Sequence, residues 1–561
     1  MTIQLQQCII ISVLYFFYKK IMNMQKNNNL FFTIIILTFI VYNSILIYNT
    51  SFLIEGHRYF SLADDQMISM KYAKNLANGD GLVWEKGAVK VEGYSNLLWV
   101  LLMAIVHLLP IPINSISLVV QIIGLFFLLL NLFIIKKISE LIFNKNSFIV
   151  ISSLILSAFY FPLNYWAIHG FEISAIVLIL NFSIYKYLVN SNNENKQYFS
   201  FLLLAIGILL RLDLIIPYIL FLFFEFFSKK NNLKEILIYT LPLIIVIAGT
   251  TIFRFLYYGD ILPNTYYLKI SGYPFFLRLS RGMISFFLFM KNSNLFLFII
   301  PFFSIIFVRS KYIKFFLILI LGQIFYSIYV GGDAWEWWRI CNRFIVIIMP
   351  LFFMLFSLSI YRIYLFITNK FIFFANRRLL TKTILILTML ISFIRFNTPY
   401  GLSQARDWLL QESPFEVWEI KLKIELGMEI NKISNKKAVI AVVTAGVMPY
   451  FFDHKYIDLL GKNDKFIAKG KMRIFEENKN LFKYNNTLNS KYSFFYPGHL
   501  KWNYKYSLGR FKPDIIVDLW GNKKEALPFL KGYSILYIND FRLIVKNKSK
   551  NIYWAKILKH T

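Results

Sequence analysis

The fold of this chain is decided around residues 64–96, which read DDQMISMKYAKNLANGDGLVWEKGAVKVEGYSN. This stretch is polar, opens on two adjacent aspartates and lies between apolar blocks. An apolar run from Leu30 to Leu53 precedes it, and further runs long enough to cross a bilayer recur up to about Arg395. The pattern predicts a polytopic α-helical membrane protein whose functional residues gather in the polar loops between spans.

The composition supports a membrane protein. Hydrophobic residues make up 57% of the 561 residues, and 61 Lys and Arg stand against 30 Asp and Glu. A net charge of +31 is typical of a nucleic-acid surface in a soluble protein, but here the basic residues cluster beside the apolar runs, as the positive-inside rule and anionic headgroups require. We therefore expect the lipid bilayer as a partner and no nucleic acid. Only Cys8 and Cys341 are present, so no disulfide framework is expected.

Basic residues set the expected topology. Lys19, Lys20 and Lys26 precede the first span, which places the N-terminus in the cytoplasm and the loop of residues 54–96 outside. We expect about 11 transmembrane helices and read Leu97–Leu109 as a juxtamembrane or re-entrant helix that does not cross. The polar loops at 166–172, 211–213, 257–282 and 331–343 then also lie outside. The expected spans are residues 30–53, 115–135, 148–163, 173–188, 198–210, 214–227, 236–255, 295–308, 315–329, 344–367 and 380–394.

Three segments follow from this pattern. Residues 1–29 form a cytoplasmic or interfacial segment, residues 30–396 the transmembrane module, and residues 397–561 a soluble extracytoplasmic domain. In the last segment, residues 414–431 predict an amphipathic helix, and residues 437–444, 514–518, 533–537 and 541–545 predict strands, with Asn539-Asp540 as a hairpin turn. The C-terminal domain is therefore expected to be a small α/β domain. It carries no Gly-rich nucleotide loop.

Asp64 and Asp65 are the first candidates for chemistry, because they follow the first span closely. A carboxylate there could take a proton from a hydroxyl nucleophile. With Glu92, the pair could instead hold a divalent cation, which is the one cofactor that these residues suggest. The structural alternative is that one aspartate is the N-cap of a helix over residues 66–77.

A second group lies in residues 331–343, which read GGDAWEWWRICNR. Its tryptophans are typical of an interfacial belt. Arg339 and Arg343 are four residues apart, so we expect them on one helical face, where guanidinium groups could bind a lipid phosphate. Snorkelling to ordinary headgroups is the competing explanation.

A third group combines residues 254–269, RFLYYGDILPNTYYLK, with charged residues at the outer ends of spans. Aromatic rings, Asn264 and Lys269 suit sugar faces and hydroxyls, although a tyrosine-rich loop is also typical of a membrane interface. Glu172 and the Arg211/Asp213 pair contact substrate or form a buried ion pair in a cavity wall.

A series of short motifs runs in order through most of the chain. They are Asp64-Asp65, Gly79-Asp80-Gly81-Leu82-Val83-Trp84, Val91–Asn96, Gly170-Phe171-Glu172, Arg211-Leu212-Asp213, Tyr258–Lys269, Gly331-Gly332-Asp333 with Arg343-Phe344, Ala445-Gly446, Ile457–Gly461 and Gly498-His499. With these motifs the chain resembles the GT-C superfamily of membrane glycosyltransferases, and more narrowly the bacterial family that includes the mycobacterial terminal β-(1→2) arabinofuranosyltransferase. Phe171 departs from the leucine expected between Gly170 and Glu172, Lys74 departs from a frequent arginine, and the tryptophan-rich run departs from the mycobacterial pattern.

The resemblance implies an inverting transferase that takes a sugar, such as arabinofuranose, from a polyprenyl-phosphate donor at the outer face of the bacterial cytoplasmic membrane. Asp64 or Asp65 would be the general base, and Lys269, Arg339 and Arg343 would match the charge of the leaving phosphate. His499 and the C-terminal domain would bind the acceptor, a cell-envelope glycan or glycolipid. The remaining substrate-binding candidates are Glu92, Tyr94, Asn96, Glu172, Arg211, Asp213, Asn264 and Asp333.

Two alternatives stay open. One is transfer of aminoarabinose or a hexose to lipid A, O-antigen or protein. The other is a lipid-linked sugar flippase or transporter. The enzyme is favoured over the transporter because the ionisable residues gather at one membrane face and no internal repeat is visible, whereas transporters carry midplane sites on repeated, broken helices.

Overall fold

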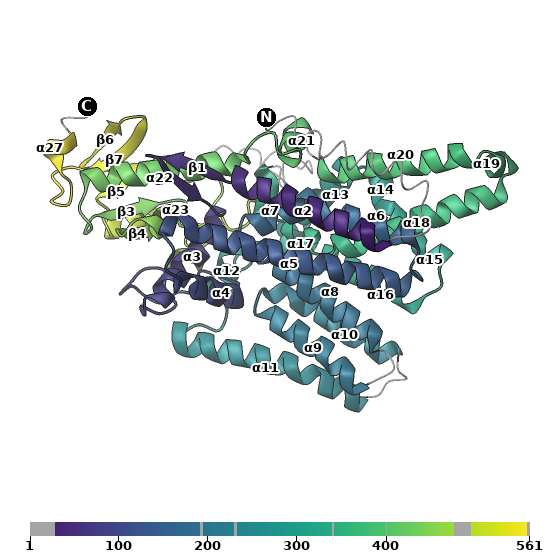
Figure 1. The fold of residues 1–561 in the computed structure, drawn as a ribbon. Helices are drawn as coiled ribbons and strands as arrows, with labels where there is room; N and C mark the ends of the chain where they lie inside the picture. The colour runs from purple at the N-terminus through teal and green to yellow at the C-terminus, as the bar shows by residue number, and fades with distance from the viewer. Residues whose placement is uncertain are drawn as a thin grey trace.

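The computed structural model describes residues 28–190, 194–228, 233–338, 341–399, 401–475 and 495–557. The predictions for Cys8 and for the cytoplasmic segment up to residue 27, and that for Arg339, lie outside these residues. Figure 1 shows an elongated body of helices that carries a small β-sheet domain at one end. The chain is therefore a mostly helical protein with a C-terminal sheet domain, as the sequence predicts.

Six helices are long and apolar enough to cross a membrane, judged by length and composition. They are α2 (Asn28–Asn49), α5 (Ile113–Ile142), α11 (Leu233–Tyr258), α16 (Lys311–Val330), α18 (Met349–Lys370) and α20 (Arg378–Asn397). Two bent pairs bring the number to as many as eight within the described residues. In the first pair, α6 (Ser147–Ala158) and α7 (Phe161–Ile168) meet at 44°.

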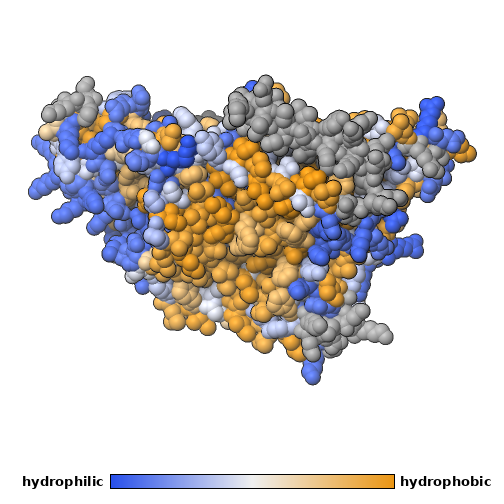
Figure 2. All heavy atoms as spheres, in the orientation of Figure 1, coloured by the Kyte–Doolittle hydropathy of each residue, from blue (hydrophilic) through white to orange (hydrophobic). Residues whose placement is uncertain are grey.

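The second bent pair joins α13 (Phe275–Asn292), at 106°, to the segment of α14 (Leu295–Ile299) and α15 (Ser304–Phe307). Three shorter helices pack beside the spans, namely α8 (Ile173–Val189), α9 (Glu194–Ile208) and α10 (Ile215–Ser228). Each predicted apolar run coincides with one of these helices or pairs. Figure 2 shows the apolar surface as a broad orange field between the hydrophilic C-terminal domain and the charged opposite end. The chain is thus a multi-pass membrane protein.

Three local predictions differ from the structure. The first span ends at Asn49, and residues 51–60 form an antiparallel hairpin of β1 (Ser51–Ile54) and β2 (His57–Phe60). The predicted loop at 257–282 holds α12 (Asn264–Lys269) and the start of α13. Helix α13 was missed because Arg278 and Arg281 lower its hydropathy, yet both side chains are buried within the protein.

The first polar loop contains α3 (Asp64–Ala77), and α4 (Leu97–His107) directly follows the loop and packs against α3. The N-cap of α3 is Ala63, and no side chain caps the helix. The expectation that an aspartate is the N-cap is therefore wrong. Both aspartates lie in the first turn, where the helix dipole favours negative charge.

The C-terminal domain is a five-stranded mixed sheet in the order β4-β3-β5-β7-β6. Strands β3 (Val439–Val442), β5 (Ile515–Ile516), β6 (Tyr533–Ile538) and β7 (Phe541–Lys546) were predicted, whereas β4 (Lys455–Asp458) was not. Ile538 pairs with Phe541 across the two-residue turn, where Asn539 takes a positive φ of 50°. The predicted amphipathic helix is α22 (Phe415–Ile433).

The C-terminal domain packs tightly onto the first polar loop. A Cβ at Gly446 would lie 1.9 Å from the carbonyl oxygen of Asp64, so only glycine fits. A Cβ at Gly93 would likewise lie 2.1 Å from Oδ1 of Asn463. The Trp84 indole donates to the carbonyl of Ala445 at 3.0 Å. These close approaches fix the domain against α3 and the loop that follows it.

Candidate active site

Two cavities meet at Asp65. The tail cavity, about 260 Å³, lies between α7, the segment 403–423 and the loops of the C-terminal domain. The loop cavity, about 230 Å³, is lined mainly by residues 65–69, 93–96, 211–213, 263–270, 326–334 and 343–344. Asp65, Ala334 and Lys462 line both cavities. A group bound in either cavity would therefore face the Asp65 carboxylate.

Asp65 is held by cations from three different elements. Lys462 forms an ion pair with Oδ1 of Asp65, and Nη1 of Arg343 lies 4.0 Å from Oδ2. Burial would raise the pKa of Asp65, but the charges of Lys462, Lys269 and Arg343 outweigh it and hold that pKa well below its ordinary value. Asp65 is therefore ionised in the ligand-free protein.

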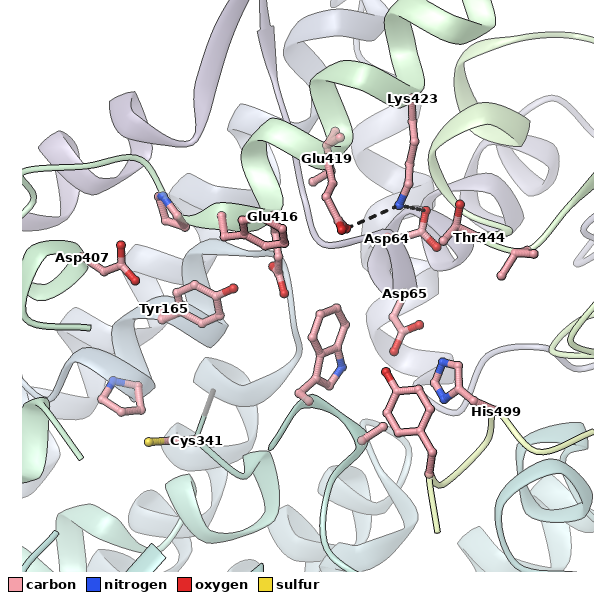
Figure 3. Close-up of a pocket in the computed structure, with 18 of the residues that line it drawn as sticks. Asp64, Asp65, Tyr165, Cys341, Asp407, Glu416, Glu419, Lys423, Thr444 and His499 are labelled. Carbon is pink, nitrogen blue, oxygen red and sulfur yellow. Dashed lines mark ion pairs between the residues drawn. The ribbon is translucent and has the colours of Figure 1, made fainter. Parts of the chain in front are cut away.

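Asp64 faces only the tail cavity, where the close-up view shows it beside Lys423 and Thr444 (Figure 3). Its Oδ1 accepts a hydrogen bond from the backbone N–H of Val447 at 3.1 Å, and Nζ of Lys423 lies 3.9 Å away. These contacts tie Asp64 to the C-terminal domain. The two aspartates thus differ in position, although they are adjacent in sequence.

Lys462 is a site residue that the sequence analysis missed. It lies in a turn that Asp458 organises, since the Asp458 carboxylate accepts from the backbone N–H groups of Leu460, Gly461 and Asn463 at 2.7–3.0 Å. Asn264 donates to the carbonyls of Gly461 and Lys462 and fixes the same turn from α12. The signal was available, because Lys462 directly follows the Ile457–Gly461 motif.

Lys269 lines the loop cavity without an ion-pair partner among the residues that the structure describes. Burial lowers the pKa of its ammonium group, and the nearby charge of Arg343 lowers it further. A positive charge in that position is stabilised by an added anion. Lys269 is therefore the cation of this cavity best placed to receive a phosphate.

Arg343 is clamped by Asp333, which also lines the loop cavity. Its Nε and Nη2 donate to Asp333 at 2.7 and 2.8 Å. The guanidinium also lies 4.7 Å from the ring centre of Phe171, so this phenylalanine forms a cation–π contact with Arg343. Asn342 is the N-cap of the short helix α17 (Arg343–Val346), so Arg343 is the first residue of that helix.

The predicted pair of Arg211 and Asp213 forms a bidentate ion pair at 2.6 and 2.7 Å and lines the loop cavity. Nη1 of Arg211 also lies 3.6 Å from Glu172. Asn96 donates to Glu172 at 3.0 Å, so a continuous polar wall runs from the first loop to the spans. Tyr94 lines the same cavity, and its hydroxyl lies 2.9 Å from that of Tyr258.

Glu92 and His499 differ from their expected surroundings. Glu92 accepts from Nε of Arg254 at 2.7 Å and lines neither cavity. His499 lines the tail cavity, and burial together with Lys462 lowers its pKa to about 3, so the ring is neutral. Within the described ranges no three His, Cys, Asp or Glu residues form a group able to hold a metal ion. The divalent-cation site of Asp64, Asp65 and Glu92 is therefore not formed.

Comparison with known proteins bears on the fold. A domain family described only as a domain of unknown function (DUF8728) matches residues 415–546, which run from α22 to β7. A comparison with curated protein sequences finds no match.

Among solved structures, ArnT from Cupriavidus metallidurans bound to undecaprenyl phosphate is similar, with 10% identity and a TM-score of 0.51 over 76% of this chain and 85% of ArnT. Its apo state gives the same score and identity over 91% and 97%. The Archaeoglobus fulgidus oligosaccharyltransferase tethered with an acceptor peptide reaches 0.49 at 11% identity over 93% and 74%. The chain thus shares the fold of ArnT, whereas the resemblance to the GT-C arabinofuranosyltransferases stays a prediction.

Proposed function

We propose that this protein is a membrane glycosyltransferase that moves a sugar from a polyprenyl-phosphate carrier to a hydroxylated acceptor, with Asp65 as the general base. The observation that carries the proposal is the position of Asp65 in the wall common to both cavities. A base that takes a proton from an acceptor and faces a donor must occupy such a position.

The loop cavity suits the donor phosphate. Lys269, Arg343 and Lys462 line it together, and Lys269 has no carboxylate partner among the described residues. Preorganised cations stabilise the charge that develops on a leaving phosphate. ArnT, which shares the fold, is bound to undecaprenyl phosphate in one of its structures, and this supports the same class of carrier here.

The reaction follows from this arrangement. Asp65 takes the proton of the acceptor hydroxyl, the oxygen attacks the anomeric carbon from the face opposite the phosphate, and the bond between that carbon and the phosphate oxygen breaks with inversion. The phosphate leaves with the electron pair. Asn96, Tyr94 and Glu172, which line the loop cavity, would contact the sugar hydroxyls.

The low pKa of Asp65 fits this role once the donor is bound. In the ligand-free protein three cations hold the carboxylate ionised but make it a weak base. A bound phosphate brings negative charge to Lys269, Arg343 and Lys462 and competes with Asp65 for them. Donor binding therefore raises the pKa of Asp65 and strengthens the base when it is needed.

The finer assignments belong to the same proposal. The resemblance favours a pentose such as arabinofuranose, with aminoarabinose or a hexose as the alternative, and a site outside the bacterial cytoplasmic membrane. Residues 30–396 would hold the donor and residues 397–561 the acceptor. A reporter fused after Thr561 should read as extracytoplasmic, and a cytoplasmic reading would contradict the orientation.

The test is a deletion strain of the source organism, complemented with variants and analysed for surface glycans by mass spectrometry. We expect the deletion to lose one sugar residue, which names donor and acceptor class. Wild-type protein and the exposed control Asp540→Asn should restore it, whereas Asp65→Asn should not at equal membrane levels. Restoration by Asp65→Asn would sink the general-base assignment, and an unchanged deletion glycome would sink the transferase.

A further inference from the structure

We propose that the tail cavity takes an acceptor that carries a cationic amino group, for which Glu416 and Asp407 are the recognition residues. This inference rests on the proposed function and names the class of its acceptor. It concerns the end of the cavity away from Asp65, where Figure 3 places Asp407, Tyr165 and Glu416.

The first observation is that carboxylates outnumber cations in the lining of the tail cavity. Its lining contains two lysines, Lys423 and Lys462, and more than twice as many carboxylates. The carboxylates of the lining are Asp64, Asp65, Asp407, Glu416 and Glu419. Lys462 pairs with Asp65, and Lys423 lies between Asp64 at 3.9 Å and Glu419 at 4.0 Å. The described residues leave Asp407 and Glu416 without a lysine or arginine partner.

The second observation is the burial of the Glu416 carboxylate. Its residue is 7% exposed, and neither carboxylate oxygen makes a hydrogen bond of normal geometry to a described residue. The Tyr165 hydroxyl and the His169 ring face it, with Nε2 of His169 3.9 Å from Oε2. The charge of Lys423 lowers the pKa of Glu416, while those of Glu419 and Asp65 raise it. His169 is neutral, because burial lowers its pKa to about 4.

A buried carboxylate without a cationic partner is costly, and native proteins seldom leave one unless a ligand completes it. Burial raises the pKa of Glu416 to about 7 and that of Asp407 to about 6. A ligand ammonium in this place would restore the ionised form of both groups. A neutral hydroxyl would give a hydrogen bond but would leave the excess negative charge of the cavity uncompensated.

The walls of the cavity favour an amine on a sugar-like frame. Phe161, Tyr165 and Trp335 line it beside Glu416. Aromatic faces pack against the apolar faces of sugar rings and also attract ammonium groups. A metal ion is the poorer occupant, because no group of three His, Cys, Asp or Glu forms within the described ranges. An amino sugar satisfies the carboxylates and the rings together.

Binding of three sugars to the purified full-length protein in nanodiscs tests the proposal. Glucosamine, glucose and N-acetylglucosamine share one ring and differ in the amine, and saturation-transfer NMR titration gives their relative affinities. We expect glucosamine to bind about tenfold more tightly than the other two, the value of one buried charge pair. Glu416→Gln should abolish this preference, and Asp407→Asn, which serves if Glu416→Gln does not fold, should reduce it. The exposed control Asp540→Asn, in the turn between β6 and β7, should retain it.

Two outcomes overturn the proposal. One is equal binding of glucosamine and glucose, and the other is an unchanged preference in folded Glu416→Gln. The result is separable from the proposed function, since Asp65→Asn should keep the amine preference while it loses transfer. Transfer to a neutral glycan without amine preference would leave the transferase standing and remove this inference alone.

Discussion

The two cavities that meet at Asp65 differ in their charge balance. Four carboxylates and four cations line the loop cavity, whereas five carboxylates and two lysines line the tail cavity. In the loop cavity, carboxylates clamp Arg211, Arg343 and Lys462, and Lys269 is left over as a cation. In the tail cavity, Asp407 and Glu416 are left over as carboxylates. This difference matches the two charge movements of the proposed reaction. Negative charge develops on the phosphate beside Lys269, and the proton leaves the acceptor toward the acidic side.

The largest expected effect comes from the border between the cavities. Asp65→Asn keeps the size of the side chain but removes the base, so transfer to the natural acceptor should fall about 10²- to 10⁴-fold. Asp64→Asn, one residue away but facing only the tail cavity, should cost much less. Initial rates in nanodiscs, at matched protein amounts, check both. A greater loss in Asp64→Asn would move the base to the neighbouring residue and break the comparison.

The next effect concerns Lys269, the lining cation of the loop cavity that has no ion-pair partner among the described residues. Lys269→Met removes the unpaired charge and should weaken binding of undecaprenyl phosphate about tenfold, since a charge-assisted contact contributes about 1.5–3 kcal/mol. Lys531→Met, an exposed lysine of the C-terminal domain, is the matched control. Native mass spectrometry with added lipid measures the ratio of bound to free protein. Equal occupancy in Lys269→Met and wild type would place the phosphate elsewhere.

A third prediction concerns the contact between the C-terminal domain and α3. Gly446→Ala forces a Cβ against the Asp64 carbonyl, so the C-terminal domain must shift, at a cost of about 1–3 kcal/mol for an overpacked contact. Its melting temperature should fall, and hydrogen exchange should rise in residues 444–463 and in α3. Gly249→Ala, where a Cβ meets nothing within 4 Å, should leave both unchanged. Matching exchange in Gly446→Ala and wild type would mean that the two regions are not coupled there.

The smallest effect sharpens the electrostatics around Arg343. Phe171→Leu restores the residue expected from the resemblance and removes the ring 4.7 Å from the guanidinium. Arg343 keeps the Trp166 ring, 5.3 Å away, and its ion pair with Asp333. We therefore expect a loss of about 0.5–1 kcal/mol, the lower part of the cation–π range, and a fall in lipid-phosphate affinity of about two- to fivefold. The same mass spectrometry resolves this change. An affinity above that of wild type would show that the ring competes with the phosphate for Arg343.

Much of the fold was predictable because its signals are local. Apolar runs, the amphipathic helix and the Asn539-Asp540 hairpin each depend on neighbouring residues in the chain. Strand β4 was missed because its four residues, KYID, have no alternation long enough to recognise. Helix α13 was missed because its buried arginines read as polar loop.

The site was predictable only in part, because its residues are far apart in the sequence. The sequence suggested Asp65, Lys269 and Arg343 one by one, but only the fold brings them to one carboxylate. Glu92 does not lie beside the aspartates as expected, because it pairs with Arg254 on helix α11, which is distant in sequence. Lys462 had only its place after the Ile457–Gly461 motif as a signal, and Glu416 had none, since each lies against residues more than two hundred positions away in the chain.

The turn that Asp458 organises determines when the site can assemble during protein synthesis. Ribosomes release the N-terminal part of a chain first, and domains generally fold in that order. Until residue 462 has emerged and its turn has closed, Asp65 lacks its ion-pair partner and the loop cavity lacks one wall. A chain interrupted in the membrane module could therefore insert its spans but could not assemble the complete site. Synthesis of the final domain acts as the last step of activation.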